Sequence, residues 1–421
     1  MTGSARHDDP GPEPGDGRAA LARLVADEGR RVLASLIRVV GDWQLAEDAV
    51  GDAVVRALET WPRTGVPPEP RAWLTLTARR RALDLVRREH ARPGKETDAV
   101  RHDPGPRDDV PDTPGLEDDL LRLVFTCCHP ALDPPAQVAL ALRTLCGLST
   151  AEVARALLIS EASAVKRITR AKQKIARAGI PYRVPAPEEL PARVRGVAAT
   201  VYFLFNEGYS ATAGDDPLRV ELADEALRLA RLLHGLLPDE ATVTGLLALV
   251  LLQHSRRDAR RDPDGRPVLL ADQDRRRWRR EEITEGVTLT GEGLRRCPDR
   301  PDPYVVQAAI AACHALAASP EDTDWAAVVS WYDVLVSVSD GPVERLNRAV
   351  ALGERDGAAA GLAAVDAVDG LGHYPAWHAS RAVLLSRVGE REAALAAMAR
   401  AVELETNTAV KEELRRRLAT L

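Results

Sequence analysis

The sequence is short of cysteine, of aromatic residues and of long apolar runs, and each shortage excludes a class of protein. Five irregularly spaced cysteines are too few for a disulfide framework, and their odd number suits a reducing cytoplasm. Aromatic residues make up only 4% of the chain and β-branched alternation is rare, which argues against β-sheets. The longest apolar run, Val243–Gln253, is too short to cross a membrane, and Met1–Arg18 is too polar for a signal peptide. We therefore expect a soluble, cytoplasmic, all-α protein.

The charge of the chain is distributed unevenly. A net charge of −6 over 421 residues would normally argue against nucleic acid as a partner. However, residues 71–92 hold seven basic and two acidic residues, and residues 161–183 hold seven basic and one acidic. Two basic islands in a balanced background predict two separate contacts with a polyanion.

Breaks rich in proline, glycine and aspartate divide the chain into expected parts. Periodic apolar residues predict helices on both sides of a linker that contains five prolines. In the first domain we expect helices near residues 19–40, 44–61 and 71–89, with a break at Trp61-Pro62. The expected parts are a disordered tail (1–18), a first helical domain (19–92), a flexible linker (93–115), a second helical domain (116–183) and a C-terminal helical domain (184–421).

The segment Leu148–Ile175 has the pattern of a helix-turn-helix. Ser149 can cap a first helix, and Glu152, three residues on, completes a capping box. Ser160 is the expected cap of a second helix, whose basic stripe suits DNA phosphates. The second helix of such a motif enters the major groove of DNA. The pattern therefore predicts a DNA-binding protein.

Residues 19–182 resemble a sigma factor of the extracytoplasmic-function (ECF) class. Gly41–Trp61, with Ala46-Glu47-Asp48, resembles the region 2 helix that docks on the polymerase clamp. Arg71–Arg88 resembles the promoter-reading helix of region 2, and Leu148–Ile175 resembles the helix-turn-helix of region 4. The resemblance implies a region 2 helical bundle and a region 4 helix-turn-helix. It also implies binding to core RNA polymerase, at the β′ clamp and the β flap, and to promoter DNA.

Two residues depart from the family pattern. Arg80 stands where the family usually has Asn, and arginine cannot make the bidentate contact with adenine that asparagine makes. Leu158 occupies the turn position that usually holds glycine, which accepts a positive φ at low cost. These residues put the −10 base preference in doubt and leave the turn either differently shaped or mildly strained.

The resemblance assigns candidate contact residues on three helices. Asp48 and Asp52 lie four residues apart and share a helix face, and Trp73 is expected to pack in the core rather than to stack on a base. The candidates for core-polymerase binding are Ala46, Glu47, Asp48 and Asp52. Those for the −10 element are Trp73, Arg79, Arg80, Asp84, Arg87 and Arg88. Those for the −35 element are Ser163, Lys166, Arg167, Arg170 and Lys174.

The C-terminal part resembles the helical extension of one ECF subgroup. Gly357 and Gly389 are 32 residues apart, close to the roughly 34-residue period of tetratricopeptide repeats. Generic pairing of alanine-rich helices would give a similar pattern. The resemblance implies a tetratricopeptide-like domain that tunes activity and leaves open a regulatory protein partner. It rests on residues 201–210 (VYFLFNEGYS), 268–278 (VLLADQDRRRW), 308–315 (AAIAACHA) and 346–352 (LNRAVAL), with FTCCH (125–129) at the start of region 4.

Other polar residues leave enzyme and metal chemistry open but not favoured. Cys127-Cys128-His129 lacks a spaced second pair of ligands, so buried structural cysteines are favoured over zinc or a redox pair. Glu207, Asp272, His314 and Asn347 lie in apolar helical surroundings without a recognisable nucleophile–base spacing. We therefore expect no catalytic residue, metal or cofactor.

The leading hypothesis is an ECF sigma factor that directs promoter-specific initiation and is modulated by its C-terminal domain. The alternative is a helix-turn-helix regulator that acts without polymerase and senses a ligand or protein through its repeats. A third hypothesis is an enzyme in the C-terminal half. A simple regulator needs neither a clamp-binding helix nor a second basic island, so residues 46–52 and 71–88 favour the sigma factor.

Overall fold

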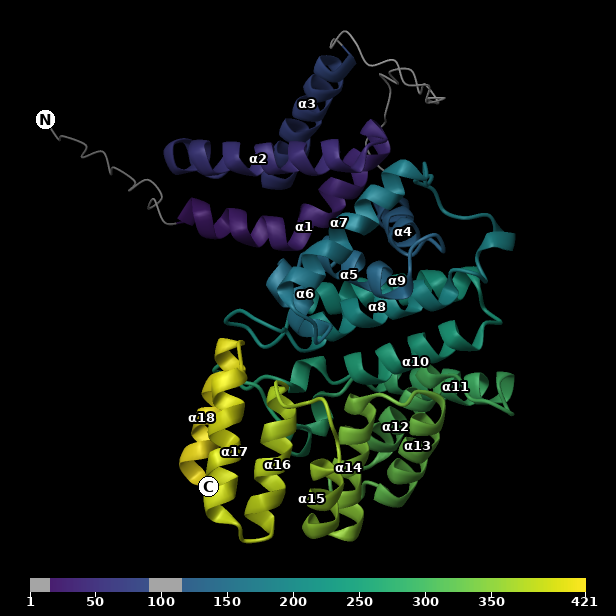
Figure 1. Ribbon diagram of the computed structural model, residues 1–421, viewed down its shortest axis with the longest axis vertical. Coiled ribbons are helices and arrows are strands. Elements are labelled where there is room, and N and C mark those ends of the chain that lie inside the picture. Colours follow the sequence, from purple (N-terminus) through teal and green to yellow (C-terminus); the bar gives the residue numbers. More distant parts are fainter. Residues whose placement is uncertain (1–15, 91–115) are drawn as a thin grey trace, which may run out of the picture. The chain divides into compact units, whose positions relative to one another are not determined.

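A computed structural model describes residues 16–90 and 116–421 (Figure 1). These residues form eighteen α-helices and no β-strand, so the all-α prediction is confirmed for the described chain. Helix formation begins at Asp16, within the segment expected to be a disordered tail. The rest of that tail and the whole of the expected linker lie outside the described residues. None of the described helices has the length and apolar character needed to cross a membrane.

The chain divides into two compact units, which are described separately below. The first comprises residues 1–150 and 162–190, and the second comprises residues 151–161 and 191–421. The division passes through the helix-turn-helix. Its short first helix and turn group with the second unit, while its second helix groups with the first.

Three helices form the N-terminal bundle of the first unit (Figure 1). They are α1 (Asp16–Val40), α2 (Trp43–Thr64) and α3 (Pro70–His90), and each packs against the other two. A stripe of alanines on α2 lets the helices approach closely, because small side chains at helical spacing present little bulk. The stripe consists of Ala46, Ala49, Ala53 and Ala57, all of them buried, and ends at buried Trp61.

Helix α2 extends past the expected break at Trp61-Pro62. It continues through Pro62 to Thr64, so the prediction that proline ends the helix is wrong by one turn. Proline removes one backbone hydrogen bond from a helix. Because only the last residues of α2 follow Pro62, this loss does not end the helix. Gly65, with φ of 78°, then ends the helix, and its N–H donates to the Trp61 carbonyl at 3.0 Å.

Four further helices carry the region of the helix-turn-helix. They are α4 (Leu116–Cys127), α5 (Pro134–Thr144), α6 (Thr150–Ala156) and α7 (Glu161–Arg177). Asp133 caps α5 by accepting from the Ala136 N–H at 2.7 Å, with Pro134 in the first turn, as expected for a helix start. Ser149 and Ser160, the expected caps, directly precede α6 and α7.

The turn after α6 is a Schellman motif built on a leucine. The Ile159 N–H donates to the Ala154 carbonyl at 2.9 Å, and the Leu158 N–H donates to the Arg155 carbonyl at 3.1 Å. Leu158 has φ of 52° and is the one non-glycine residue with positive φ in the described chain. The same pair of bonds ends α7, where Gly179 takes the left-handed position. The turn therefore keeps the usual shape, and Leu158 bears the strain.

The second unit is an array of antiparallel helix pairs (Figure 1). Its central helix, α10, is apolar on every side and is buried by four neighbours, as expected for a helix without a polar face. The larger helices are α8 (Val194–Tyr209), α9 (Val220–Leu236), α10 (Ala241–His254), α11 (Arg280–Arg296), α12 (Pro303–Leu316), α13 (Trp325–Val338), α14 (Pro342–Asp356), α15 (Ala358–Asp366), α16 (Pro375–Arg387), α17 (Arg391–Leu404) and α18 (Thr408–Thr420).

The two glycines that suggested a repeat both lie between paired helices, in turns of different length. Gly357 joins α14 to α15 with φ of 98°, and Gly389 joins α16 to α17 with φ of 88°. In the first pair, Gly361 lies so close to Gly353 that a Cβ on it would come within 2.5 Å of the Gly353 Cα. Each pair therefore depends on a left-handed glycine between its helices.

The last helix of the array returns to the loop that follows its first helix. Asn407 is fully buried, caps α18, and donates through Nδ2 to the Asp216 carbonyl at 2.8 Å. The Thr408 N–H donates to the Gly214 carbonyl at 2.8 Å, and the Thr406 hydroxyl to the Thr212 carbonyl at 2.6 Å. These bonds join the two ends of the array, so its helix pairs form a closed assembly.

Replacing Leu158 with glycine should stabilise the protein. Leu158 is half exposed, so the change loses little buried area. A left-handed conformation costs a non-glycine residue roughly 1–2 kcal/mol. Glycine avoids this cost but loses more backbone entropy on folding, so we expect a net gain in stability of about 1 kcal/mol. Denaturant unfolding followed by circular dichroism measures the difference. Leu158→Ala keeps a Cβ and is the control; an equal gain in both variants would contradict strain at this turn.

Candidate nucleic-acid interface

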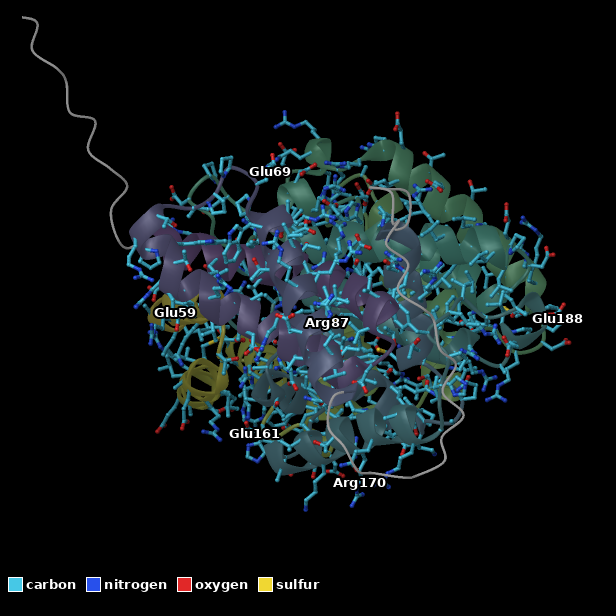
Figure 2. All side chains as sticks on the ribbon, turned by 90° about the horizontal axis from the view of Figure 1, so that it is seen from above. Glu59, Glu69, Arg87, Glu161, Arg170 and Glu188 are labelled. Atoms are coloured by element: carbon cyan, nitrogen blue, oxygen red, sulfur yellow. The ribbon has the colours of Figure 1, made fainter. Side chains whose placement is uncertain are left out.

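Helix α3 carries arginines on the face opposite its buried side. Arg80 and Arg87 are exposed and lie about two turns apart, so they point to the same side of the helix. Arg87 keeps 80% of its side chain exposed, and its contact with Asp84 is long, at 3.9 Å (Figure 2). Both guanidiniums are thus accessible to a phosphate group. The buried side of the helix consists of Leu74, Ala78 and Ala82.

The other candidates on α3 differ in exposure. Trp73 is half-buried and packs edge to face on Trp61, with ring centroids 5.5 Å apart. Arg79 is half-buried on the flank of the helix, and Asp84 is exposed. Arg88 lies on α3, but its side chain is outside those that the structure describes. The accessible basic surface of α3 therefore depends on Arg80 and Arg87.

Helix α7 presents a row of cations to solvent. Lys166, Arg170 and Lys174 follow each other at four-residue spacing and are exposed, as Figure 2 shows for Arg170. The opposite side is buried through Ala164, Ile168, Ala171 and Ile175. A groove of about 430 Å³ follows the end of the helix and is lined by Arg170, Gln173, Lys174, Arg177 and Ala178. This surface can hold several phosphates in succession.

Three other polar residues of α7 have different surroundings. Ser163 and Arg167 are half-buried, so they lie at the edge of the exposed row. Lys172, which belongs to the basic stripe in the sequence, forms an ion pair with Glu47 of α2 at 2.7 Å. The charge of Lys172 is therefore neutralised within the first unit.

Helix α2 carries acidic residues on its exposed face. Asp48 and Asp52 are exposed; Asp48 accepts from Gln44 at 3.0 Å, and Asp52 forms an ion pair with Arg81 of α3. Ala46 is fully buried, so in this structure it supports the helix and offers no surface. Glu47 accepts from the Trp43 indole at 3.0 Å in addition to its ion pair with Lys172. Of the four candidates for polymerase binding, the two aspartates are the accessible ones.

A buried carboxylate fastens the region of α4 to helix α1. Asp119 is only 1% exposed and pairs with Arg38 of α1 and with Arg122, each at 2.9 Å. The Tyr182 hydroxyl lies 2.7 Å from the Asp119 carbonyl and 3.0 Å from the Ala34 carbonyl. Burial next to Asp119 raises the pKa of Tyr182, which keeps this hydroxyl protonated. Together with Glu47–Lys172, these contacts hold α1 and α2 against α4 and α7.

The vicinal cysteines are buried, as expected for structural residues. Cys127, Cys128 and Cys146 are at most 2% exposed. Burial and the neighbouring Cys128 raise the pKa of the Cys127 thiol well above its usual value, so it stays protonated and unreactive. Among the described residues, no group of three or more His, Cys, Asp or Glu side chains is arranged to hold a metal ion.

Sequence reasoning missed the apolar residues on these same faces. Val55 and Leu58 are exposed beside the aspartates of α2, and Leu76 and Leu83 are exposed beside the arginines of α3. A helical plot would have placed Leu76 and Leu83 opposite the buried Leu74, since they lie on the side of Arg80 and Arg87. Arg177, which lines the groove of α7, was also missed.

Comparisons with known proteins identify three segments. The model of the Sigma-70 region 2 family matches residues 24–92, and that of the Sigma-70 region 4 family matches residues 122–175. A family of unknown function, DUF6596, matches residues 193–293. An uncharacterised protein of Rhizobium meliloti (strain 1021) is 43% identical over 393 residues, which cover 92% of each chain. No solved structure matches the chain. The first two matches contain every candidate residue on α2, α3 and α7.

Proposed function

The chain belongs to the sigma-70 family of RNA polymerase sigma factors, as an ECF-type member with a C-terminal extension, and we propose that α3 reads its −10 element and α7 its −35 element. Such a factor is not an enzyme; it binds core RNA polymerase and promoter DNA. A helix-turn-helix regulator that acts without polymerase is not favoured, because residues 24–92 match region 2.

The observation that carries this proposal is the pair of exposed cationic faces on helices matched by two different sigma regions. Phosphate contacts position a protein on DNA, and base contacts give it specificity. Arg80 and Arg87 supply the first face, with Leu76 and Leu83 on the same side of the helix as apolar contacts for unstacked bases. Lys166, Arg170 and Lys174 supply the second face, and Arg167 at its edge is placed to reach a base edge in the major groove. Ser163 is a smaller polar contact on the same helix.

For polymerase binding we assign the exposed face of α2. Asp48 and Asp52 give it negative charge, and Val55 and Leu58 give it an apolar centre. An apolar patch with a charged rim is the usual composition of a protein interface. The partner surface is therefore basic at its rim, on the β′ clamp, while region 4 binds the β flap.

The first unit must open before both promoter elements can be bound. The centres of the two elements lie about 25 base pairs apart, which is about 85 Å of duplex at about 3.4 Å per base pair. A compact domain of about 180 residues, the size of the first unit, has a radius of gyration of only about 16 Å. The contacts of Asp119 and the Glu47–Lys172 pair hold the two regions together. Their release therefore accompanies engagement of polymerase and promoter.

We assign a regulatory role to the C-terminal extension. Its helix pairs with glycine turns fit a tetratricopeptide-like domain, an architecture that presents a continuous surface to protein partners. The occupant we propose is a regulatory protein of the cytoplasm, where the polymerase is found. The extension then tunes how readily regions 2 and 4 act.

Run-off transcription from a pool of randomised promoters tests the core of the proposal. With core polymerase, the full chain should enrich templates that contain two motifs at a fixed spacing. Arg80→Asn should shift the −10 motif toward adenine, because an amide makes a bidentate contact with that base, and should leave the −35 motif unchanged. A lack of promoter-specific transcripts, or a change confined to the −35 motif, would contradict the assignment.

Substitutions on α7 should separate base reading from phosphate binding. Arg167→Ala in the holoenzyme should weaken promoter binding by about 1–3 kcal/mol and relax one position of the −35 motif. Lys174→Ala should weaken binding to all DNA sequences equally. It should also reduce the slope of the logarithm of the binding constant against the logarithm of salt concentration by about one. Arg183→Ala removes the same charge outside α7 and is the control. Fluorescence anisotropy across a salt series measures all three variants, and an equal loss in the control would refute the role of α7.

Opening of the first unit should be visible as a distance change. Spin labels at Arg63→Cys on α2 and Ala176→Cys on α7, with the half-buried Cys297 and Cys313 replaced, should report one short distance in the free chain. Binding of polymerase and promoter should lengthen it by tens of ångströms, as the span of about 85 Å requires.

Arg38→Gln serves as the matched variant for this measurement. It removes one arginine from Asp119 while Arg122 still pairs with the carboxylate, so the fold should persist. The free variant should populate the longer distance. If the distance between the two labels is the same in the free chain and in the promoter complex, the opening step is contradicted. The proposed role in transcription does not depend on this result.

A further inference from the structure

Three segments of the extension that have no part in promoter recognition meet at one place in the second unit. Tyr209 ends α8, Trp278 precedes α11, and His314 lies near the end of α12. Three arginines from the segment between α10 and α11 lie among them. They are Arg256, Arg260 and Arg275.

The arginines and the aromatic rings alternate. The guanidinium of Arg260 lies 3.3 Å from the centre of the Tyr209 ring, and that of Arg256 lies 5.8 Å from it. Arg256 also lies 5.9 Å from the centre of the Trp278 ring, which Arg275 approaches to 4.5 Å. Arg256 donates to the Tyr209 hydroxyl at 2.7 Å. The three guanidiniums therefore share two rings and form one continuous cluster.

No carboxylate among the described residues forms an ion pair with this cluster, although Glu321 and Asp322 act on Arg275 from a longer distance. Two neighbouring arginines do have such partners: Arg261 pairs with Asp216 at 2.8 Å, and Arg279 pairs with Asp258 at 2.9 Å. Arg256, Arg260 and Arg275 have no ion pair within 4.0 Å in the described chain, and they donate to a hydroxyl and to backbone carbonyls. The positive charge at this place is thus in excess of the negative charge.

Helix ends compensate only part of this excess. Arg260 donates to the Tyr209 carbonyl at the end of α8, and Arg275 donates to the carbonyls of His314 and Ala317 at 2.8 and 2.7 Å, at the end of α12. Each helix C-terminus offers roughly half a negative charge, against three full positive charges. Arg256 receives neither a helix end nor a carboxylate.

The uncompensated positive charge affects the neighbouring titratable groups. Burial, Arg256 and Arg275 lower the pKa of His314 to about 4, so this imidazole is neutral at pH 7. Burial and the neighbouring arginines also lower the pKa of Arg260. The indole N–H of Trp278, which is only 4% exposed, has no acceptor among the described residues. It belongs to the ring that Arg256 and Arg275 both contact.

We propose that Arg256, Arg260, Arg275 and the Trp278 indole N–H form a binding site for an oxyanion, either a phosphate or a carboxylate group. Such a group supplies the negative charge and the acceptor oxygens that these donors require. Arg256, Arg260 and Arg275 are half-buried, so an anion reaches them from the surface of the second unit. The site lies in the extension and does not depend on promoter recognition.

Titration of the full chain with inorganic phosphate tests this site directly. Phosphate should raise the thermal midpoint and change the tryptophan fluorescence, in comparison with sodium chloride of equal ionic strength. Trp278→Phe should abolish the fluorescence change, because that ring lies against the arginines. A second arm with acetate distinguishes a carboxylate ligand from a phosphate ligand by which of the two binds more tightly.

Charge-removing variants localise the effect. Arg256→Gln should weaken phosphate binding at least about tenfold, the effect of losing one charge-assisted hydrogen bond. Arg266→Gln, at an exposed arginine paired with Asp264, is the control and should bind as the parent does. If circular dichroism finds Arg256→Gln unfolded, Arg256→Lys retains the charge and should bind more weakly through its single ammonium. Equal binding by parent and folded Arg256 variants, or no response to either anion beyond that to chloride, would overturn the proposal.

Discussion

Close approach of helices through small residues is the constraint on which both units depend. The chain has three phenylalanines and two methionines, so its cores cannot be filled by large side chains alone. On α2, alanines between buried tryptophans let α1 and α3 pack close to the helix axis. In the second unit, a Cβ on Gly208 would come within 2.3 Å of the Ala223 nitrogen, and one on Gly245 within 2.5 Å of the Val305 nitrogen. Larger residues at these points would force the helices apart.

Against this apolar framework, the charged residues divide into two groups. Most arginines of the second unit have a carboxylate partner, so they serve the fold or solubility and attract no external anion. The exposed arginines of α3, the lysines and arginines of α7, and the cluster around Tyr209 and Trp278 have few partners or none. Function in this protein therefore follows from which cations the fold leaves without an internal anion, since only those can attract DNA or another anion.

Much of the fold was predictable from local pattern. The three N-terminal helices were expected within a few residues of their bounds, because an apolar residue every three or four positions is a local signal. The helix end predicted at Pro62 was wrong because the effect of a proline depends on how many turns of the helix follow it. Leu158 was recognised as unusual, but only the two hydrogen bonds of its turn reveal that the usual shape is kept. Lys172 was counted as part of the DNA-binding stripe, and nothing near it in the sequence announced Glu47, which lies 125 residues away.

The sequence by itself determined the helical class, the two basic helices and the acidic helix that precedes them, because periodicity and charge are properties of neighbouring residues. The tertiary structure decided which of those charges are accessible, because an ion pair such as Glu47–Lys172 or Arg38–Asp119 depends on distances between remote parts of the chain. It also decided that three separate segments of the extension meet around Tyr209 and Trp278. Each of their arginines is unremarkable in the sequence, and only their proximity makes the excess charge.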